Sequence, residues 1–281
     1  MDKLYKIALL LLWTFLGFQA ISQNDYRWKD SCLSANALDF RIPVPDGYQR
    51  LPVPAHSFGE WLRQLPLKPG RPQVMLYNGE PKHNQNAHFL VIDIDPGTRD
   101  LQQCADAVMR LKAEYHFACG EYSQIHFNFT SGDRADYMRY RDGYRPQFTG
   151  NKVYWSKSAA SDGSYKNFRK YMDLVFSYAG TFSLDKELLV VEDITQIQPG
   201  DVFIQGGFPG HAVMVVDVAE NIETGKRIFL LAQSYMPAQE MHVLRNPTDK
   251  SLNPWYPVTE GQLYTPEWTF QEGTLKRFGN K

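Results

Sequence analysis

Three apolar segments follow one another closely in the second half of the chain, and each has the composition of a β-strand. They cover residues 201–205, 211–218 and 228–235, and a shorter fourth segment covers 241–244. Their connections carry Gly-Gly, Pro-Gly and Thr-Gly pairs, which favour hairpins over crossover connections. This succession predicts an antiparallel sheet, which is the strongest constraint that the sequence places on the fold.

Helical patterns come before the strand region and supply the second component of the fold. Asp100 has the character of an N-cap with Gln103 three residues later, and apolar residues then recur at helical spacing. A second helix is predicted over 165–178, ending at Gly180, and a capping-box pattern at Ser57 predicts a short helix. Further strands are predicted at 73–77, 87–95 and 124–129. Helices packed on an antiparallel sheet give an α+β fold class.

The first 22 residues have the pattern of a secretory signal peptide. Lys3 and Lys6 precede an apolar run over 7–18, and Ala20-Ile21-Ser22 offers the small-x-small pattern that a signal peptidase cleaves. The run is shorter than the about 20 apolar residues that span a membrane, so we expect no stable membrane span after its removal. We therefore predict an exported protein, periplasmic or extracellular, that begins at Gln23. An uncleaved anchor is the alternative.

The composition is that of a folded protein. Hydrophobic residues make up 43% of the 281 residues, and 30 Lys and Arg are balanced by 31 Asp and Glu. This balance excludes a disordered or low-complexity chain, and it argues against a nucleic-acid partner, which usually requires excess positive charge. Residues 23–281 are long enough to bury a core without disulfides, and we expect them to form a single globular α+β domain.

Three cysteines, Cys32, Cys104 and Cys119, are an odd number, so at least one of them is free or paired outside the chain. Whether Cys32 and Cys119 pair is left open by the sequence. Cys104 lies in the first turn of its predicted helix, where backbone N–H groups and the helix dipole favour a nucleophilic thiolate. It also falls on the apolar face of that helix, and a buried structural cysteine is the alternative.

His211 opens a predicted strand directly after a glycine-rich segment, 206–210, which would leave room for a ligand beside the imidazole. It is our candidate general base, and a structural histidine at a strand edge is the alternative. A base of this kind needs a polar neighbour on its second ring nitrogen. The next strand offers Gln233 and Ser234, and we favour Gln233 because its amide oxygen can accept from the imidazole without adding charge.

The segment over 132–163 is predicted to be mostly loop, with arginines and aromatic residues interleaved. Arg141 could hold a carboxylate, and the rings of Tyr144 and Trp155 could stack on sugars or peptides, so these three are candidate substrate-binding residues. A solvated loop is the alternative. We predict no metal site and no other cofactor. The nearest metal candidates match no ligand motif: His83, His88, Asp93 and Asp95.

Two segments, 197–204 and 210–216, resemble the Pro-Gly-Asp and Gly-His strands of papain-like cell-wall hydrolases of the NlpC and CHAP type. In those enzymes a cysteine at a helix N-terminus precedes the histidine strand, and a polar residue on the following strand completes the site. Cys104, His211 and Gln233 occur in that order. The resemblance implies a papain-like core with Cys104 as nucleophile, although the Asp-Cys-Ser neighbourhood typical of these enzymes is replaced by Gln-Gln-Cys-Ala-Asp.

A second resemblance spans nearly the whole chain after the signal segment. The matching segments are 77–80, 84–88, 100–107, 126–129 and 206–212. They are similar to an exported family of Bacteroidetes catalogued as domain of unknown function 4846. This resemblance implies export and a single domain, and it implies no activity.

These observations lead to one hypothesis and one alternative. The hypothesis is an exported cysteine hydrolase, an amidase or peptidase, that cleaves an amide in a cell-envelope peptide or in peptidoglycan. The alternative is a non-catalytic envelope protein that binds glycan or peptide in the same cleft. The oligomeric state is not predicted.

Overall fold

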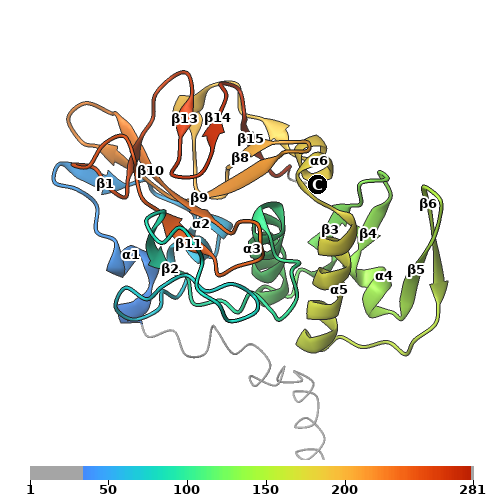
Figure 1. Ribbon diagram of the computed structural model, residues 1–281. Helices are drawn as coiled ribbons and strands as arrows, with labels where there is room; N and C mark the ends of the chain where they lie inside the picture. Colours follow the sequence, from blue (N-terminus) through green and yellow to red (C-terminus); the bar gives the residue numbers. More distant parts are fainter. Residues whose placement is uncertain (1–33, 280–281) are drawn as a thin grey trace, which may run out of the picture.

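The computed structural model describes residues 34–279. The predicted signal segment and Cys32 lie outside the described residues. The described chain combines helices with antiparallel strands, as the sequence patterns predict (Figure 1).

The largest sheet is antiparallel throughout, and β9 is its longest strand. Along the sheet, the order is β2 (His88–Val91), β11 (His242–Leu244), β10 (Arg227–Gln233), β9 (His211–Asn221), β8 (Val202–Gln205), β15 (Leu275–Arg277) and β7 (Leu189–Val190). Two short strands extend it: β1 (Tyr48–Arg50) pairs with β9, and β12 (Tyr256–Pro257) pairs with β10. The four strands predicted from the closely spaced apolar segments are therefore confirmed as β8, β9, β10 and β11.

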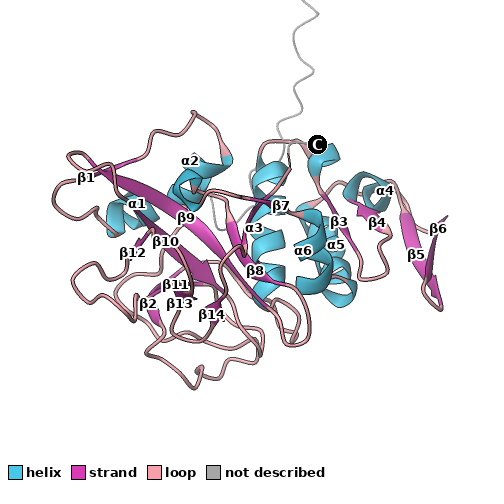
Figure 2. Cartoon of the chain, turned by 90° about the horizontal axis from the view of Figure 1, so that it is seen from above, coloured by secondary structure: helices cyan, strands magenta, loops and turns pink. Residues whose placement is uncertain are grey.

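The helices lie mainly beside one face of this sheet (Figure 2). They are α1 (Leu38–Arg41), α2 (Phe58–Arg63), α3 (Cys104–Ala118), α4 (Tyr137–Arg141), α5 (Tyr165–Tyr178) and α6 (Thr181–Glu187), with 3-10 turns at Ser34–Asn36, Tyr122–Gln124 and Ile194–Gln196. None of the helices over residues 34–279 is long and apolar enough to cross a membrane.

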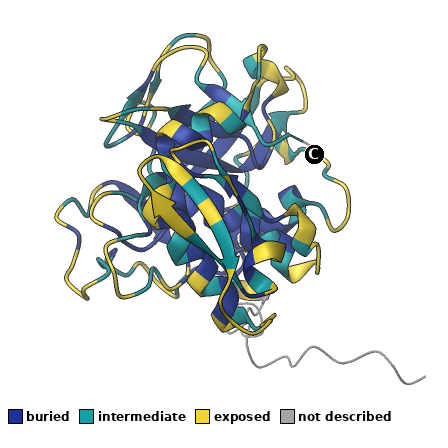
Figure 3. Cartoon of the chain, turned by 90° about the vertical axis from the view of Figure 1, so that its right-hand side faces the viewer, coloured by how far each residue is buried: buried dark blue, intermediate teal, exposed yellow. Residues whose placement is uncertain are grey.

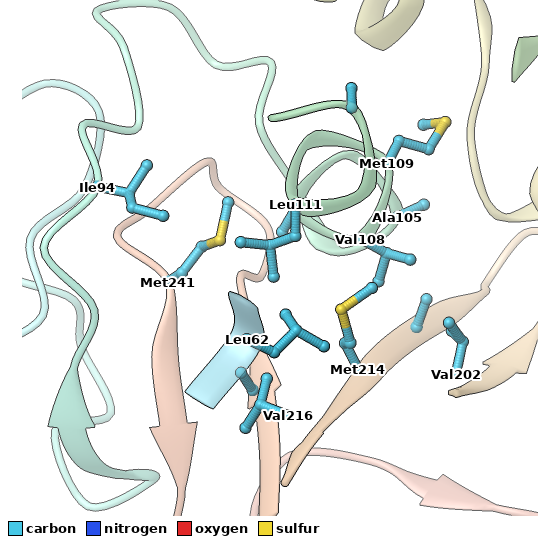
Figure 4. Close-up of a cluster of buried hydrophobic side chains, with 14 of the residues drawn as sticks. Leu62, Ile94, Ala105, Val108, Met109, Leu111, Val202, Met214, Val216 and Met241 are labelled. Carbon is cyan, nitrogen blue, oxygen red and sulfur yellow. The ribbon is translucent and has the colours of Figure 1, made fainter. Parts of the chain in front are cut away.

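The side chains of β9 alternate between two hydrophobic clusters, as the period of a strand requires. Ala212, Met214 and Val216 belong to the cluster beneath α3, which Figure 4 shows with Ala105, Val108 and Leu111. Val213 and Val215 belong to the cluster on the opposite face. That second cluster is covered by a hairpin of β13 (Leu263–Tyr264) and β14 (Thr269–Phe270).

A buried carboxylate on β9 ties the N-terminal elements to the sheet. Asp217 is fully buried, and it accepts hydrogen bonds from Arg50 Nε at 2.7 Å and from Arg63 Nε at 2.6 Å. The two arginines come from β1 and α2, so one carboxylate joins both elements to β9.

The start of α3 differs from its prediction by a few residues. The helix begins at Cys104, with Gln103 as its N-cap and with the Asp106 carboxylate accepting the Gln103 N–H at 3.0 Å. Asp100, the predicted cap, instead accepts the backbone N–H of Ala238 at 2.7 Å. The Asp100 side chain therefore makes a long-range hydrogen bond instead of capping the helix as the local pattern predicts.

The other helix predictions hold better. The helix predicted over 165–178 is α5, and Ser164 caps it by accepting the Asn167 N–H at 3.2 Å. Gly180 does not close α5 but precedes α6, which the sequence reading missed. Ser57 caps α2 as predicted, accepting the Glu60 N–H at 3.3 Å.

The segment over 132–163 is not mostly loop, and this prediction is wrong. It contains β4 (Arg134–Asp136), which pairs with β3 (His126–Asn128), followed by α4 and a hairpin of β5 (Tyr144–Thr149) and β6 (Lys152–Lys157). The hairpin strands are largely exposed or half-buried, and they face the viewer in Figure 3. Because none of the residues in these two strands is buried, the apolar pattern of a strand is weak there. The strand predicted at 73–77 forms only isolated bridges.

Candidate active site

Cys104 is the first residue of α3 and carries a free thiol. Its sulfur lies close to the backbone N–H of Ala212, the residue after His211 in β9, and this N–H favours the thiolate. Val215 donates its backbone N–H to the Asp201 carbonyl oxygen, on the β8 side of β9. Backbone N–H groups alternate between the two edges of a strand, so the N–H of Ala212, three residues earlier, points to the β10 side. On that side β10 ends at Gln233, one residue before the position that would pair with Ala212.

His211 is held by a buried polar neighbour on the adjacent strand. Its Nε2 lies 2.9 Å from Gln233 Oε1, and both residues are almost completely buried. A carboxamide oxygen only accepts hydrogen bonds, so Nε2 carries the proton and Nδ1 carries the lone pair. Among residues 34–279, Nδ1 has no hydrogen-bond partner, and the Cys104 thiol is not hydrogen-bonded to it.

Aromatic rings fix the plane of the imidazole. The ring centroid of His211 lies 4.9 Å from that of Tyr235, 5.3 Å from that of Trp268 and 5.7 Å from that of Phe270. These contacts place the imidazole on the face of the sheet that the β13–β14 hairpin covers. Burial among these rings disfavours the charged imidazolium and lowers the pKa of His211 to about 4, although the Gln233 hydrogen bond opposes this shift.

Of the two polar residues at the end of β10, the structure brings Gln233 to His211. The Ser234 hydroxyl instead lies 2.9 Å from the carbonyl oxygens of Gln102 and Gln239. Ser234 therefore anchors the chain just before α3. The register left open by the sequence is settled by Ala232 pairing with Met214, which puts Gln233 on the His211 face of the sheet.

The electrostatics at Cys104 differ from the expectation of a lowered pKa. Burial, together with the nearby negative charge of Asp106, raises the pKa of the Cys104 thiol to about 11, and the backbone N–H groups offset only part of this effect. Asp106 is itself buried, and its own pKa rises to about 8 for that reason. At neutral pH the resting site therefore contains a neutral thiol and a neutral imidazole.

The sequence predicts that the glycine-rich segment before His211 leaves space for a ligand. Gly206 and Gly210 are instead packed closely against other protein atoms. A Cβ on Gly210 would lie 2.4 Å from Thr181 Oγ1 and 2.6 Å from the Gly207 carbonyl oxygen, and one on Gly206 would lie 2.7 Å from Asp185 Cβ. These residues are glycines because α6 and the turn itself approach too closely for a side chain.

The three candidate substrate-binding residues lie on α4 (Arg141) and on the β5–β6 hairpin (Tyr144 and Trp155), away from Cys104 and His211, and their role in substrate binding stays a prediction. Figures 1 and 2 both place the β5–β6 hairpin beyond α5, on the side away from β9. Trp155 stacks on Phe129 with ring centroids 6.5 Å apart. The Arg139 guanidinium covers Tyr144 and Trp155, and that of Arg141 covers the Tyr122 ring. These side chains stabilise a lobe made of β3–β6, α4 and α5.

Sequence reasoning missed a charged cluster behind Gln233. Glu267, between β13 and β14, accepts a hydrogen bond from Gln233 Nε2 at 2.7 Å and forms an ion pair with Lys82. Gln233 Nε2 also lies 3.3 Å from Nε2 of His242. The sequence gives one hint of this cluster: His242 lies in the predicted strand that follows the one carrying Gln233. No local pattern distinguishes Lys82 or Glu267 from other charged residues.

The histidines and acids considered as metal ligands do not converge. The rings of His88 and His242 lie 6.2 Å apart, and His88 Nε2 contacts the Pro72 carbonyl oxygen at 3.1 Å. Among the described residues, no group of three histidine, cysteine or acidic side chains could hold a metal ion.

The profile of a protein family described as "Domain of unknown function (4846)" matches residues 38–277. The chain belongs to this family. No curated protein and no solved structure matches the chain.

Proposed function

We propose that this protein is an exported cysteine hydrolase with a papain-like site, in which Cys104 is the nucleophile, His211 the general base and Gln233 the orienting residue. The hydrogen bond of 2.9 Å between His211 Nε2 and Gln233 Oε1 carries the proposal. It leaves Nδ1 as the basic nitrogen of an imidazole, and the backbone N–H of the next residue, Ala212, lies close to the Cys104 sulfur. Nucleophile, base and orienting group would thus come from the neighbouring elements α3, β9 and β10.

The proposed reaction begins with two neutral groups. The Cys104 sulfur attacks the carbonyl carbon of an amide while the thiol proton moves to His211 Nδ1, and the Gln233 oxygen stabilises the imidazolium that forms. The amine then leaves with the proton from Nδ1, and a thioester remains on Cys104. Water hydrolyses the thioester with His211 acting again as base, which releases the carboxylic acid product and restores the Cys104 thiol.

The neutral resting state has a kinetic consequence. Because the pKa of the thiol is about 11 and that of the imidazole about 4, proton transfer is coupled to the attack rather than completed before it. The thiol must also turn toward Nδ1, since the two are not hydrogen-bonded at rest. Hydrogen bonds of this kind often form only when substrate is bound.

The proposed substrate is an amide in a cell-envelope peptide, most simply in the stem peptides of peptidoglycan. Two sequence observations support this choice: the export signal pattern over 1–22 and the resemblance of 197–204 and 210–216 to cell-wall hydrolases. The β5–β6 lobe is not part of the proposed cleft.

The non-catalytic alternative is favoured by one observation. A thiol with a raised pKa and no hydrogen bond to an imidazole is also what a buried structural cysteine shows. In that case the protein would bind glycan or peptide beside His211 without cleaving it.

The test is the release of amines from isolated peptidoglycan sacculi by the purified protein, followed by mass spectrometry of the soluble fragments. We expect the wild-type protein to release new amino termini and Cys104→Ser to reduce the rate at least about 100-fold. Gln233→Met serves as a milder variant that keeps the nucleophile. Equal release by wild type and Cys104→Ser, or no release by wild type, overturns the hydrolase. Retention of both proteins on sacculi without cleavage supports the binding protein.

A further inference from the structure

We propose that Glu267 is a positioning residue that fixes the tautomer of His211 by fixing the orientation of the Gln233 carboxamide. Glu267 does not touch His211 and lies on the opposite side of Gln233 from it. The proposal concerns the same site as the proposed function, and its meaning for catalysis rests on that function. The tautomer itself is a property of the resting protein.

Both hydrogens of the Gln233 amide nitrogen are directed at acceptors. Nε2 donates to the Glu267 carboxylate at 2.7 Å and lies 3.3 Å from Nε2 of His242. His242 Nδ1 lies 2.9 Å from the backbone carbonyl oxygen of Glu240. A carbonyl oxygen only accepts, so the proton of His242 is on Nδ1 and its Nε2 is an acceptor for Gln233.

A flipped carboxamide would be strongly disfavoured by this arrangement. The Gln233 oxygen would then face the Glu267 carboxylate and the lone pair of His242, and all three are acceptors. The Gln233 amide nitrogen would face His211, which could accept only through Nε2. Glu267 therefore selects the orientation in which oxygen meets His211, and that oxygen in turn requires the proton on Nε2.

Glu267 is itself held in place. One carboxylate oxygen accepts from Asn84 Nδ2 at 3.2 Å, and the other pairs with the Lys82 ammonium. The side chains of Lys82 and Glu267 are only 6% and 11% exposed, so the pair is shielded from water. The Glu267 oxygen that pairs with Lys82 is also the one that accepts the hydrogen bond from Gln233 Nε2.

This chain of contacts determines which ring nitrogen is basic. With the proton on Nε2, the lone pair of His211 is on Nδ1, the nitrogen that the proposed reaction uses to take the thiol proton. With the opposite tautomer, Nδ1 would carry a hydrogen and could not act as base. Glu267 thus controls basicity at Nδ1 through Gln233.

The test is long-range 1H–15N NMR of the full protein labelled with 15N-histidine, at neutral pH and without substrate. The chain has seven histidines, and His211→Gln assigns the signals of interest. The 15N shifts separate a protonated ring nitrogen from a bare one. We expect wild-type His211 to show a protonated Nε2 and a bare Nδ1.

The decisive variant is the double substitution Lys82→Met and Glu267→Met, which removes both charges with side chains of similar size and so leaves no buried ion unpaired. We expect a mixture of His211 tautomers. The matched control, Lys82→Met alone, keeps the acceptor at Glu267 and should retain the wild-type tautomer. If the double variant does not fold, Glu267→Gln replaces it. Its single carbonyl oxygen cannot serve Asn84, Lys82 and Gln233 together, so a minor Nδ1–H tautomer should appear.

A single Nε2–H tautomer in the folded acceptor-free variant, or in Glu267→Gln where that variant is used, overturns the proposal. So does an Nδ1–H tautomer in the wild type. Failure of the proposed function can be told apart from failure of this inference. The NMR experiment reports the His211 tautomer even if the protein cleaves no amide. The opposite result is also distinguishable. If Cys104→Ser abolishes amide cleavage but the substitutions at Glu267 leave the His211 tautomer unchanged, the proposed hydrolase function stands and only the role of Glu267 is overturned.

Discussion

The carboxamide oxygen of Gln233 lies 2.9 Å from Nε2 of His211, and the backbone N–H of the residue after His211 lies close to the sulfur of Cys104. One short stretch of β9 is therefore next to both Gln233 and the thiol. The chain brings these groups together from α3, β9 and β10, which are far apart in the sequence.

The first prediction concerns the reactivity of Cys104. Because burial raises the pKa of the thiol to about 11, the thiolate fraction at pH 7 is small. We expect iodoacetamide to label Cys104 on the order of 100-fold more slowly in the folded protein than in urea, where the pKa is about 8.5. Labelling should accelerate up to the highest pH at which the protein stays folded. Peptide-resolved mass spectrometry measures the rate, and rapid labelling at pH 6–7 would instead indicate an ion-paired thiolate.

The second prediction concerns Asp106. Burial raises its folded-state pKa to about 8, above the unfolded value of about 4, so the folded protein holds a proton that the unfolded chain releases. The resulting stability is fully present below pH 4 and is lost as the pH rises toward 8. Asp106→Asn removes this dependence and can still accept the Gln103 N–H.

We therefore expect the stability of Asp106→Asn relative to wild type to increase between pH 4 and pH 8, by about 1 kcal/mol or more in total. Urea unfolding at several pH values measures it. A constant difference across this range would show that the Asp106 carboxyl is ionised in the folded protein. Above pH 8, where Asp106 is ionised in the wild type, the variant should also label faster at Cys104, because the negative charge that raises the pKa of the thiol is gone.

The third prediction concerns Gly210. An added Cβ would lie 2.4 Å from Thr181 Oγ1 and 2.7 Å from the Gln205 carbonyl oxygen, so Gly210→Ala must displace α6 or the start of β9. We expect a loss of about 1–3 kcal/mol in the free energy of unfolding and a shift of the His211 ring signals. Gly180→Ala is the control, because nothing lies within 4 Å of its added Cβ. Equal effects of the two substitutions would contradict the steric argument.

The fourth prediction concerns the buried carboxylate of Asp217. Asp217→Asn leaves Arg50 and Arg63 facing a neutral group, and we expect it to cost about 3–5 kcal/mol of unfolding free energy. Denaturant unfolding measures the loss. Asp136→Asn breaks an ion pair with Arg134 in which both side chains are solvent-exposed, and it should cost less than about 1 kcal/mol. A small effect at Asp217 would mean that the network contributes little to stability.

The central strands and α5 could be predicted because their signals are local. β8, β9 and β10 are nearly continuous apolar runs, and a serine cap marks the start of α5. The β5–β6 hairpin could not be predicted in the same way, because its exposed strands lack a buried face.

The site was predictable only in part. Cys104, His211 and Gln233 lie on elements with strong patterns, so their order along the chain could be read directly. Glu267 comes from a covering hairpin that meets Gln233 only through tertiary packing. The pKa of Cys104 follows from burial beneath neighbouring elements, which outweighs the helix N-terminus that the sequence makes visible.

β9 is bonded to β8 on one edge and to β10 on the other, and the His211 ring is wedged among Tyr235, Trp268 and Phe270. The imidazole is thus packed on several sides by aromatic rings. Under the proposed function, the sulfur would have to approach Nδ1 by torsion about the Cα–Cβ bond of Cys104. Changes in the bulk of residues around that thiol should then alter turnover while leaving the geometry of the histidine untouched.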